Sequence, residues 1–291
     1  MNLLSRELSV RTQPAGGPVD TTVQQGPDRW IEHAGRIILF VHGYNNTISV
    51  AREAYDTFST RLAERVREAA AEILGPLYRF YWPGDAALGL LSVISYPVET
   101  EDAKASAAPL AEFLRNLYGA SGHPARPVDI VSHSLGGRVL LETLTELAHE
   151  GILDGVVKRV CMMAPAVLVE QVEPEGLLYD GATLPETLTI LTSEDDWVLW
   201  LAFPLGQTIA EGGSGRALGR YGPPPGLAAR HEPVSGGVGH TQYWDCPDTV
   251  ASVIIDALEF TPRRRELVGR STPGRETAPP TAIEAREIGT R

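Results

Sequence analysis

The sequence predicts an α/β protein in which a mostly parallel, doubly wound sheet is flanked by helices. Three observations lead to this class. Short apolar runs recur along the chain, amphipathic segments lie between them, and residues 128–144 have the pattern of a strand, a sharp turn and a helix. Continuous apolar runs are typical of parallel strands that are covered on both faces. Strands that alternate with helices favour right-handed crossovers between parallel neighbours.

Five strands are expected, each short and rich in β-branched or aromatic residues. They are residues 36–41, 77–82, 128–132, 156–163 and 188–192. Four amphipathic helices lie between or after them, at 50–73, 102–118, 137–149 and 249–260. The first helix illustrates the pattern, because Tyr55, Phe58, Leu62 and Val66 follow each other at spacings of three and four. That spacing places apolar side chains on one face of a helix, which then packs against the sheet.

Three segments depart from this rhythm. Residues 1–30 are polar and are expected to form an N-terminal arm, extended or paired as short edge strands, before an α/β domain at 31–260. Residues 201–239 are rich in glycine and proline and predict either a substrate-facing flap or a surface insertion. Residues 261–291 lack an apolar face and predict a polar tail that is disordered or lies across the surface.

Charge and composition restrict the partners. The 291 residues include 25 basic and 37 acidic side chains, for a net charge of −12. An acidic surface repels nucleic acid and anionic membranes, so a small-molecule substrate is expected instead. The sequence has no apolar run of signal-peptide or membrane-span type, which favours a cytoplasmic protein, and it leaves the oligomeric state open. The two cysteines, Cys161 and Cys246, imply no disulfide framework.

The turn at Ser134 carries the chemistry. Ser132-His133-Ser134-Leu135-Gly136 follows an apolar strand and opens a helix. A serine on such a strained strand-to-helix turn exposes its hydroxyl, and small flanking residues let the strand and the helix pass closely. The pattern departs from Gly-x-Ser-x-Gly only in having Ser132 at the first small position. It therefore predicts a nucleophile elbow, against the alternative of a serine in an ordinary turn or helix cap.

A serine nucleophile needs a base and an orienting acid, in the chain order serine, acid, histidine for this kind of elbow. Past Asp195 and Asp196, which follow a strand after Ser134, the histidines are His231 and His240. His240 is favoured as the base because it precedes the final helix, whereas His231 lies deeper in the irregular insertion. Asp195 and Asp196 both follow a strand, and Asp196 is favoured as the acid because the apolar residues after it can anchor its loop.

The oxyanion hole requires two main-chain N–H donors. One is expected from Leu135, after the nucleophile, and the other from Tyr44, because Gly43 allows a sharp turn after the first central strand. His42 and His133 are expected to support the site by hydrogen bonding. No cysteine and histidine cluster has metal-ligand spacing, and no glycine-rich phosphate loop follows a strand, so no metal or cofactor is expected.

Several motifs together resemble those of the α/β hydrolases, and more narrowly those of a poorly characterised bacterial serine-hydrolase family. They are the run FVHGYNN at 40–46, Trp82-Pro83-Gly84, Tyr96 and Asp102, the elbow at 132–136, and the spacing of Ser193, Asp196 and Leu199. The resemblance covers about residues 35 to 200, and more weakly 231 to 260. It implies an α/β-hydrolase fold and supports Asp196 over Asp195, but it implies no settled substrate.

The sequence thus predicts an esterase-like or lipase-like serine hydrolase of carboxylic esters or related acyl compounds, with Ser134, His240 and Asp196 as its triad. Two alternatives remain open. The same triad could transfer the acyl group to an alcohol or amine, or the fold could serve as a binding module without catalysis.

Overall fold

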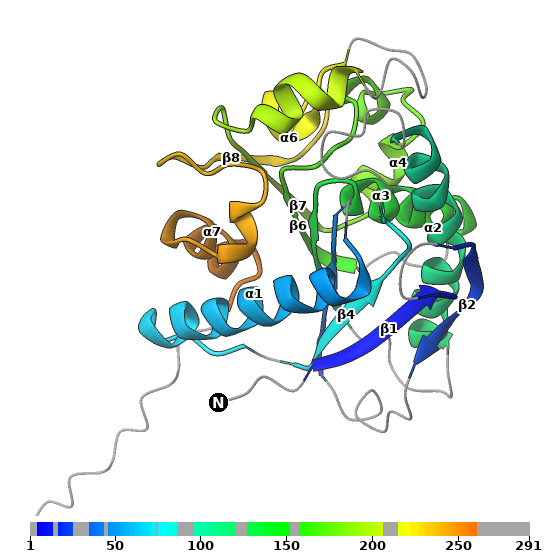
Figure 1. Cartoon of the computed structure of the whole chain (residues 1–291), viewed down its shortest axis with the longest axis horizontal. Coiled ribbons are helices and arrows are strands. Elements are labelled where there is room, and N and C mark those ends of the chain that lie inside the picture. The colour runs from blue at the N-terminus through cyan, green and yellow to red at the C-terminus, as the bar shows by residue number, and fades with distance from the viewer. Residues whose placement is uncertain are drawn as a thin grey trace, which may run out of the picture.

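The computed structural model shows a central twisted sheet with helices on both faces (Figure 1). It describes residues 5–13, 17–25, 35–43, 46–73, 75–85, 96–119, 127–151, 157–205 and 215–260. All statements of structure below concern these residues.

The sheet has eight strands in the order β2-β1-β4-β3-β5-β6-β7-β8. Every neighbouring pair is parallel except β1 and β2, which are antiparallel at one edge. The strands are β1 (Ser5–Arg11), β2 (Val19–Gln25), β3 (Ile37–Val41), β4 (Leu77–Tyr81), β5 (Val128–His133), β6 (Val157–Met163), β7 (Thr187–Thr192) and β8 (Arg230–Pro233). Because β3 and β5 are neighbours, the loops that follow these two strands meet at one edge of the sheet.

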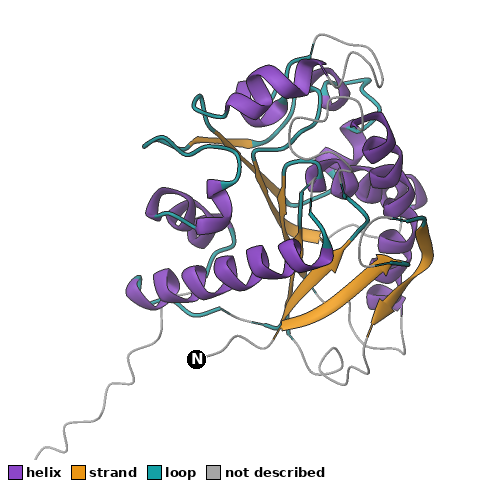
Figure 2. Ribbon diagram, in the orientation of Figure 1, coloured by secondary structure: helices purple, strands orange, loops and turns teal. Residues whose placement is uncertain are grey.

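Helices cover the two faces separately, as the ribbon in Figure 2 also shows. One face carries α1 (Ile48–Glu68), α7 (Asp248–Ala257) and the short η4 (Gln242–Asp245), and the other carries α2 (Tyr96–Gly119), α3 (Gly136–Glu150) and α4 (Tyr179–Thr183). Three further short helical turns are η2 (Val169–Val172), η3 (Val198–Ala202) and α6 (Leu218–Tyr221). This two-sided cover explains why β3, β4 and β5 are buried at every position.

An aromatic cluster joins α1 to the sheet and to the loop before α7. The Phe58 ring meets Phe40 of β3 edge-on at 5.2 Å between centroids, and it meets Trp244 of η4 at 5.3 Å. Tyr55 packs against Trp244 at 5.4 Å and donates its hydroxyl to the carbonyl oxygens of Phe40 and Phe80. Edge-to-face aromatic pairs stabilise beyond their buried area, so this cluster fixes η4, and the residues just before it, against the sheet.

The sequence prediction of an α/β fold with a mostly parallel sheet is confirmed. The five expected strands coincide with β3 to β7 within one residue at each end. The four expected helices correspond to α1, α2, α3 and α7, but α1 ends at Glu68 rather than at residue 73, and α7 ends at Ala257 rather than at residue 260. The segment expected as an arm or edge strands contains β1 and β2, so it takes part in the sheet. α2 begins at Tyr96, six residues before the expected start at 102.

Within the expected insertion at 201–239, the described residues form the end of η3, α6 and β8, the last of which adds an edge strand beside β7. Four large apolar side chains in or next to η3 are about half exposed: Trp197, Trp200, Leu201 and Leu205. The expected tail at 261–291 lies outside the described residues.

Candidate active site

The expected elbow forms the junction of β5 and α3. Ser134 stands between them with a φ of +53°, a conformation that non-glycine residues adopt only where the surroundings impose it. The surroundings here are close. A Cβ on Gly136 would collide with the carbonyl oxygens of Val41 and His42, so only glycine allows α3 to pass so near to β3. Ser132 is fully buried in β5, consistent with the need for a small residue at that position.

The structure brings together the three side chains expected as a triad. Nε2 of His240 lies 2.7 Å from Oγ of Ser134, and Nδ1 of the same ring lies 2.7 Å from Oδ2 of Asp196. Ser134 and His240 are 4% and 8% exposed, and Asp196 is fully buried. A carboxylate on Nδ1 fixes the proton there, which leaves the Nε2 lone pair facing the serine hydroxyl.

The two candidate acids have different surroundings. Asp196 is held by the main-chain N–H of Leu199, which donates to Oδ1 over 3.0 Å while Oδ2 faces His240. Of the apolar residues expected to anchor this loop, Leu199 is buried, whereas Trp197 is about half exposed. Asp195 is exposed, and its main-chain N–H donates to Oγ of Ser193. The geometry therefore pairs Asp196, and not Asp195, with the histidine.

The two candidate bases are also distinguished. His231 lies on β8, is exposed, and its Nε2 is 2.9 Å from the hydroxyl of Thr192. His240 lies in the loop between β8 and η4, which returns over the carboxyl ends of the strands to reach Ser134. Trp244, four residues after His240, is buried in the aromatic cluster and anchors this loop.

His133 packs beside the triad. Its ring centroid is 4.9 Å from that of His240, and its Nε2 is 2.8 Å from the main-chain oxygen of His240. Burial, followed by repulsion from a charge on His240, holds the pKa of His133 well below its usual value. The ring is therefore neutral, and it donates from Nε2 to the carbonyl.

The loop after β3 forms the other wall of the site. A Cβ on Gly43 would stand 2.8 Å from Cβ of Ser134, so the main chain at Gly43 packs directly against Ser134. The carbonyl oxygen of Gly43 accepts from Nδ2 of Asn46 over 2.9 Å and from Nδ1 of His42 over 2.8 Å. His42 keeps this tautomer because its Nε2 accepts the main-chain N–H of Trp82, and burial lowers the pKa of His42 to about 3.

Of the two residues expected to donate to the oxyanion, the structure describes only Leu135. Leu135 is the residue before α3, and its N–H donates to no acceptor within the described part of the chain, as the first amides of a helix usually do not. Tyr44 lies outside the described residues.

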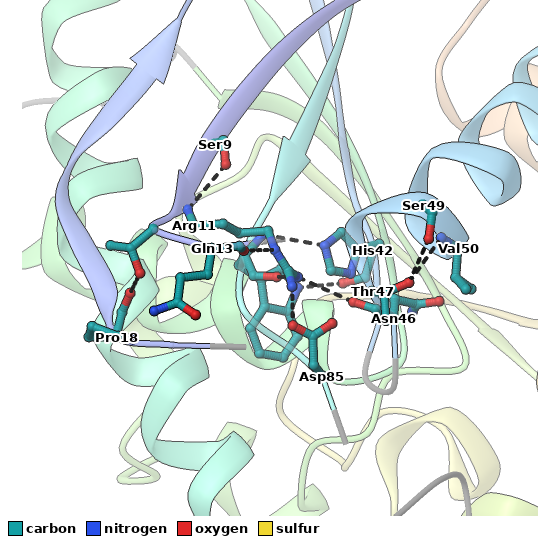
Figure 3. A network of polar contacts seen from close by, with 12 residues as sticks. Ser9, Arg11, Gln13, Pro18, His42, Asn46, Thr47, Ser49, Val50 and Asp85 are labelled. Atoms are coloured by element: carbon teal, nitrogen blue, oxygen red, sulfur yellow. Dashed lines mark hydrogen bonds and ion pairs between the residues drawn. The ribbon is translucent and has the colours of Figure 1, made fainter. Parts of the chain in front are cut away.

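Sequence reasoning did not single out Arg11, at the end of β1, or Asn46. Figure 3 shows the Arg11 guanidinium pointing toward Asp85, between the loops that follow β3 and β4. Its segment is polar in sequence and is expected as an arm, so no apolar pattern marks Arg11 as a residue that the fold buries. A buried charge is costly unless it is paired.

Within the described ranges, no group of three or more histidine, cysteine or acidic side chains is placed to hold a metal ion. No helix in the same ranges is both long and apolar enough to cross a membrane. Cys161 and Cys246 are both buried and unpaired as thiols.

The arrangement of a serine elbow, a histidine from a late loop and an acid after β7, on a mostly parallel sheet, defines an α/β-hydrolase fold. Residues 28–214 match the model of the family described as "Alpha/beta hydrolase of unknown function (DUF900)". The chain belongs to this family.

A curated relative is the transmembrane and coiled-coil domain-containing protein STS1 of Oryza sativa subsp. japonica, which is 29% identical over 180 residues. The match covers 60% of this chain and 26% of the relative, so this chain spans about a quarter of that protein.

Similar solved structures include two esterases. Esterase PE8 has a TM-score of 0.45 and 16% identity, over 86% of this chain and 99% of that one. Carboxyl esterase 2 from the mycorrhizal fungus Tuber melanosporum has a TM-score of 0.44 and 12% identity, over 89% and 87% of the two chains.

Proposed function

We propose that the protein is a serine hydrolase that cleaves carboxylic esters or related acyl compounds through an acyl-enzyme. One observation carries the proposal. The His240 ring bridges Oγ of Ser134 and Oδ2 of Asp196 at 2.7 Å on each side, in a site that is almost closed to water. A buried base within hydrogen-bond distance of a hydroxyl is the requirement for activating a serine near neutral pH.

In the proposed reaction, Oγ of Ser134 attacks the ester carbonyl carbon while Nε2 of His240 takes the hydroxyl proton. Asp196 stabilises the imidazolium that forms. The tetrahedral intermediate then collapses, the carbon–oxygen bond to the leaving group breaks, and His240 returns the proton to the departing alcohol. Water repeats the sequence on the acyl-enzyme and releases the acid.

The negative charge of the intermediate needs N–H donors. We assign one to Leu135, whose amide is unpaired within the described residues and adjoins Ser134. We assign the other to Tyr44, which follows Gly43. Each such donor is worth about 10²- to 10³-fold in rate in hydrolases of this kind.

The site gives less support to a binding module. Such a module would gain nothing from the positive φ at Ser134 or from the fully buried Asp196, both of which are costly to maintain. Acyl transfer uses the same first half-reaction and differs only in whether water or another nucleophile attacks the acyl-enzyme. It therefore remains the second candidate, to be distinguished by product analysis.

The test is covalent labelling with a fluorophosphonate, which reacts with activated serines, followed by mass-spectrometric mapping. The wild-type protein should carry the adduct on Ser134, and both Ser134→Ala and His240→Ala should lose it. His231→Ala is the matched control, because that exposed histidine contacts Thr192 and should leave labelling unchanged. Labelling that persists in His240→Ala would reject the proposed base. An unlabelled wild-type protein that is also inactive on short and long esters would favour the binding module.

A further inference from the structure

We propose that Arg11 is a positioning residue that holds the oxyanion side of the site in place. The proposal rests on the hydrolase function above, and it concerns a residue that precedes the segment matched by the family model, 28–214.

Arg11 is a buried cation at the end of β1, and its side chain is 1% exposed. Its guanidinium makes an ion pair with Asp85. Nη1 donates to the carbonyl oxygen of Trp82 over 2.8 Å. It also donates to the carbonyl oxygen of Asn46 over 3.2 Å, and Figure 3 shows Arg11 with Asn46 and Asp85. Nε of Arg11 also donates to the carbonyl oxygen of Gln13 over 3.4 Å. One side chain therefore binds two loops, the one after β3 and the one after β4.

The two residues whose carbonyls accept from Nη1, Trp82 and Asn46, also hold the loop of Gly43. Asn46 donates from its side-chain amide to the carbonyl oxygen of Gly43. Trp82 donates its main-chain N–H to Nε2 of His42 over 3.3 Å and its indole N–H to the carbonyl oxygen of His42 over 2.8 Å. The Trp82 and His42 rings also stack, with centroids 5.6 Å apart. The Arg11 guanidinium is thus connected to His42 through Trp82 and to Gly43 through Asn46.

Of these two residues, His42 and Gly43, Gly43 touches the proposed nucleophile, because a Cβ added at Gly43 would stand 2.8 Å from Cβ of Ser134. The carbonyl of Gly43 belongs to the peptide group whose N–H we assign to the oxyanion hole. In a trans peptide the C=O and N–H point in opposite directions, so the bonds that orient this carbonyl limit the direction available to that amide.

Arginine suits this place better than lysine. The planar guanidinium presents several N–H groups in a fixed fork and can satisfy acceptors on two loops at once, whereas an ammonium is a single point charge. Burial is the main cause of the low pKa of His42, and the Arg11 cation lowers this pKa further. The ring therefore stays neutral, with Nε2 as an acceptor and Nδ1 as the donor to Gly43. Asp85 balances the buried charge.

The test compares Arg11→Met and Arg11→Lys with the wild-type protein by steady-state ester hydrolysis and by amide hydrogen exchange. For Arg11→Met we expect kcat to fall by about 10²-fold, the effect of a misplaced catalytic group, while KM changes little. Exchange should become faster in peptides that cover 42–47 and 82–85 and stay unchanged in β5 and α3. Arg11→Lys, which keeps the charge, should recover part of kcat.

Two matched variants isolate the effect. Arg52→Met removes an exposed ion pair with Glu7 of the same strand and should leave kcat and both loops unchanged. Arg11→Met combined with Asp85→Asn removes the stranded carboxylate, and kcat should remain low. If Arg11→Met does not fold, Arg11→Lys is the variant compared with the wild-type protein. A kcat below the wild-type value with faster exchange in the two loops then supports the proposal, and wild-type kcat overturns it.

Wild-type kcat in Arg11→Met, or faster exchange spread evenly over the whole sheet, would overturn the proposal. The proposed function fails separately, if the wild-type protein shows no hydrolysis that depends on Ser134. In that event the exchange comparison still decides whether Arg11 holds the two loops.

Discussion

His133 donates a hydrogen bond from Nε2 to the main-chain carbonyl oxygen of His240, over 2.8 Å. The residue before the proposed nucleophile thus holds the loop that carries the proposed base. The two residues are 107 positions apart in the sequence. The contact places His240 relative to the elbow and complements the anchor that Trp244 provides four residues later in the chain.

Replacing His133 by Phe tests this contact, because Phe keeps a ring beside His240 and removes the donor. The carbonyl of His240 would be left unpaired in a buried site, which costs about 1–3 kcal/mol of stability. We expect kcat to fall about tenfold through displacement of His240, with KM little changed.

Thermal unfolding and steady-state kinetics measure the two effects. Tyr243→Phe is the control, because the buried Tyr243 hydroxyl has no hydrogen-bond partner among the described residues and its loss should be tolerated. Equal kcat in His133→Phe and the wild-type protein would mean that Trp244 alone fixes the loop.

Asp196→Asn and Asp195→Asn should differ sharply. An amide at 196 keeps the shape of the carboxylate but no longer stabilises the imidazolium, and it favours the wrong tautomer of His240. We expect kcat to fall by about 10³- to 10⁴-fold. Asp195 is exposed and does not contact His240, so Asp195→Asn should retain wild-type kcat. Ester hydrolysis by both purified variants is the measurement, and the reverse order of effects would contradict the assignment.

Gly43→Ala should impair catalysis without unfolding the protein. The added methyl group would stand 2.8 Å from Cβ of Ser134 and 2.9 Å from Nδ1 of His133, so the loop or the elbow must move. A displacement of about 1 Å at a reacting group costs about 10²-fold in kcat. Gly35→Ala is matched to it, since nothing lies within 4 Å of a Cβ there and the change should be neutral. Comparable activity of the two variants would argue against close packing of Gly43 on the nucleophile.

The fold was predictable because its strongest features are local. Buried parallel strands such as β3 and β5 are continuous apolar runs, and the helices between them repeat apolar residues at helical spacing. The elbow was also local, since Ser132 to Gly136 lie together in the sequence. Chain order limits the acid to Asp195 or Asp196 and the base to His231 or His240. The apolar residues after Asp196, the family resemblance and the position of His240 before the last helix favour Asp196 and His240, and the structure places both beside Ser134.

The support around the site was not predictable in the same way. Arg11 binds Asn46 and Trp82, which lie 35 and 71 positions later in the sequence. No pattern in the polar segment around Arg11 indicates which loops its side chain will contact. β8 has only four residues, three of them exposed, so no apolar run announces it. The α2 helix starts at Tyr96, before its amphipathic pattern becomes clear at Asp102. Such features depend on tertiary contacts rather than on local periodicity.

The stability of the protein should fall as the pH drops below about 6.5, the ordinary pKa of histidine. Burial lowers the pKa of His42 to about 3 and holds the pKa of His133 well below its usual value. Between these limits the unfolded chain binds protons that the folded protein does not. The contribution of each ring is thus complete above about pH 6.5 and declines by about 1.4 kcal/mol per pH unit below it, or about 2 kcal/mol at about pH 5 for His42.

Urea unfolding at about pH 5 and about pH 8 measures this dependence, and His133→Phe shows how much of it comes from one ring. That variant should be less stable than the wild-type protein at the higher pH, because a hydrogen bond is lost, yet it should lose less stability on acidification. His231→Gln, at an exposed position on β8, should leave the pH dependence as it is in the wild-type protein. A pH dependence of stability in His133→Phe that is steeper than or equal to that of the wild-type protein would mean that His133 is protonated in the folded state. Nε2 of His133 would then still donate to His240, but the ring would not be neutral.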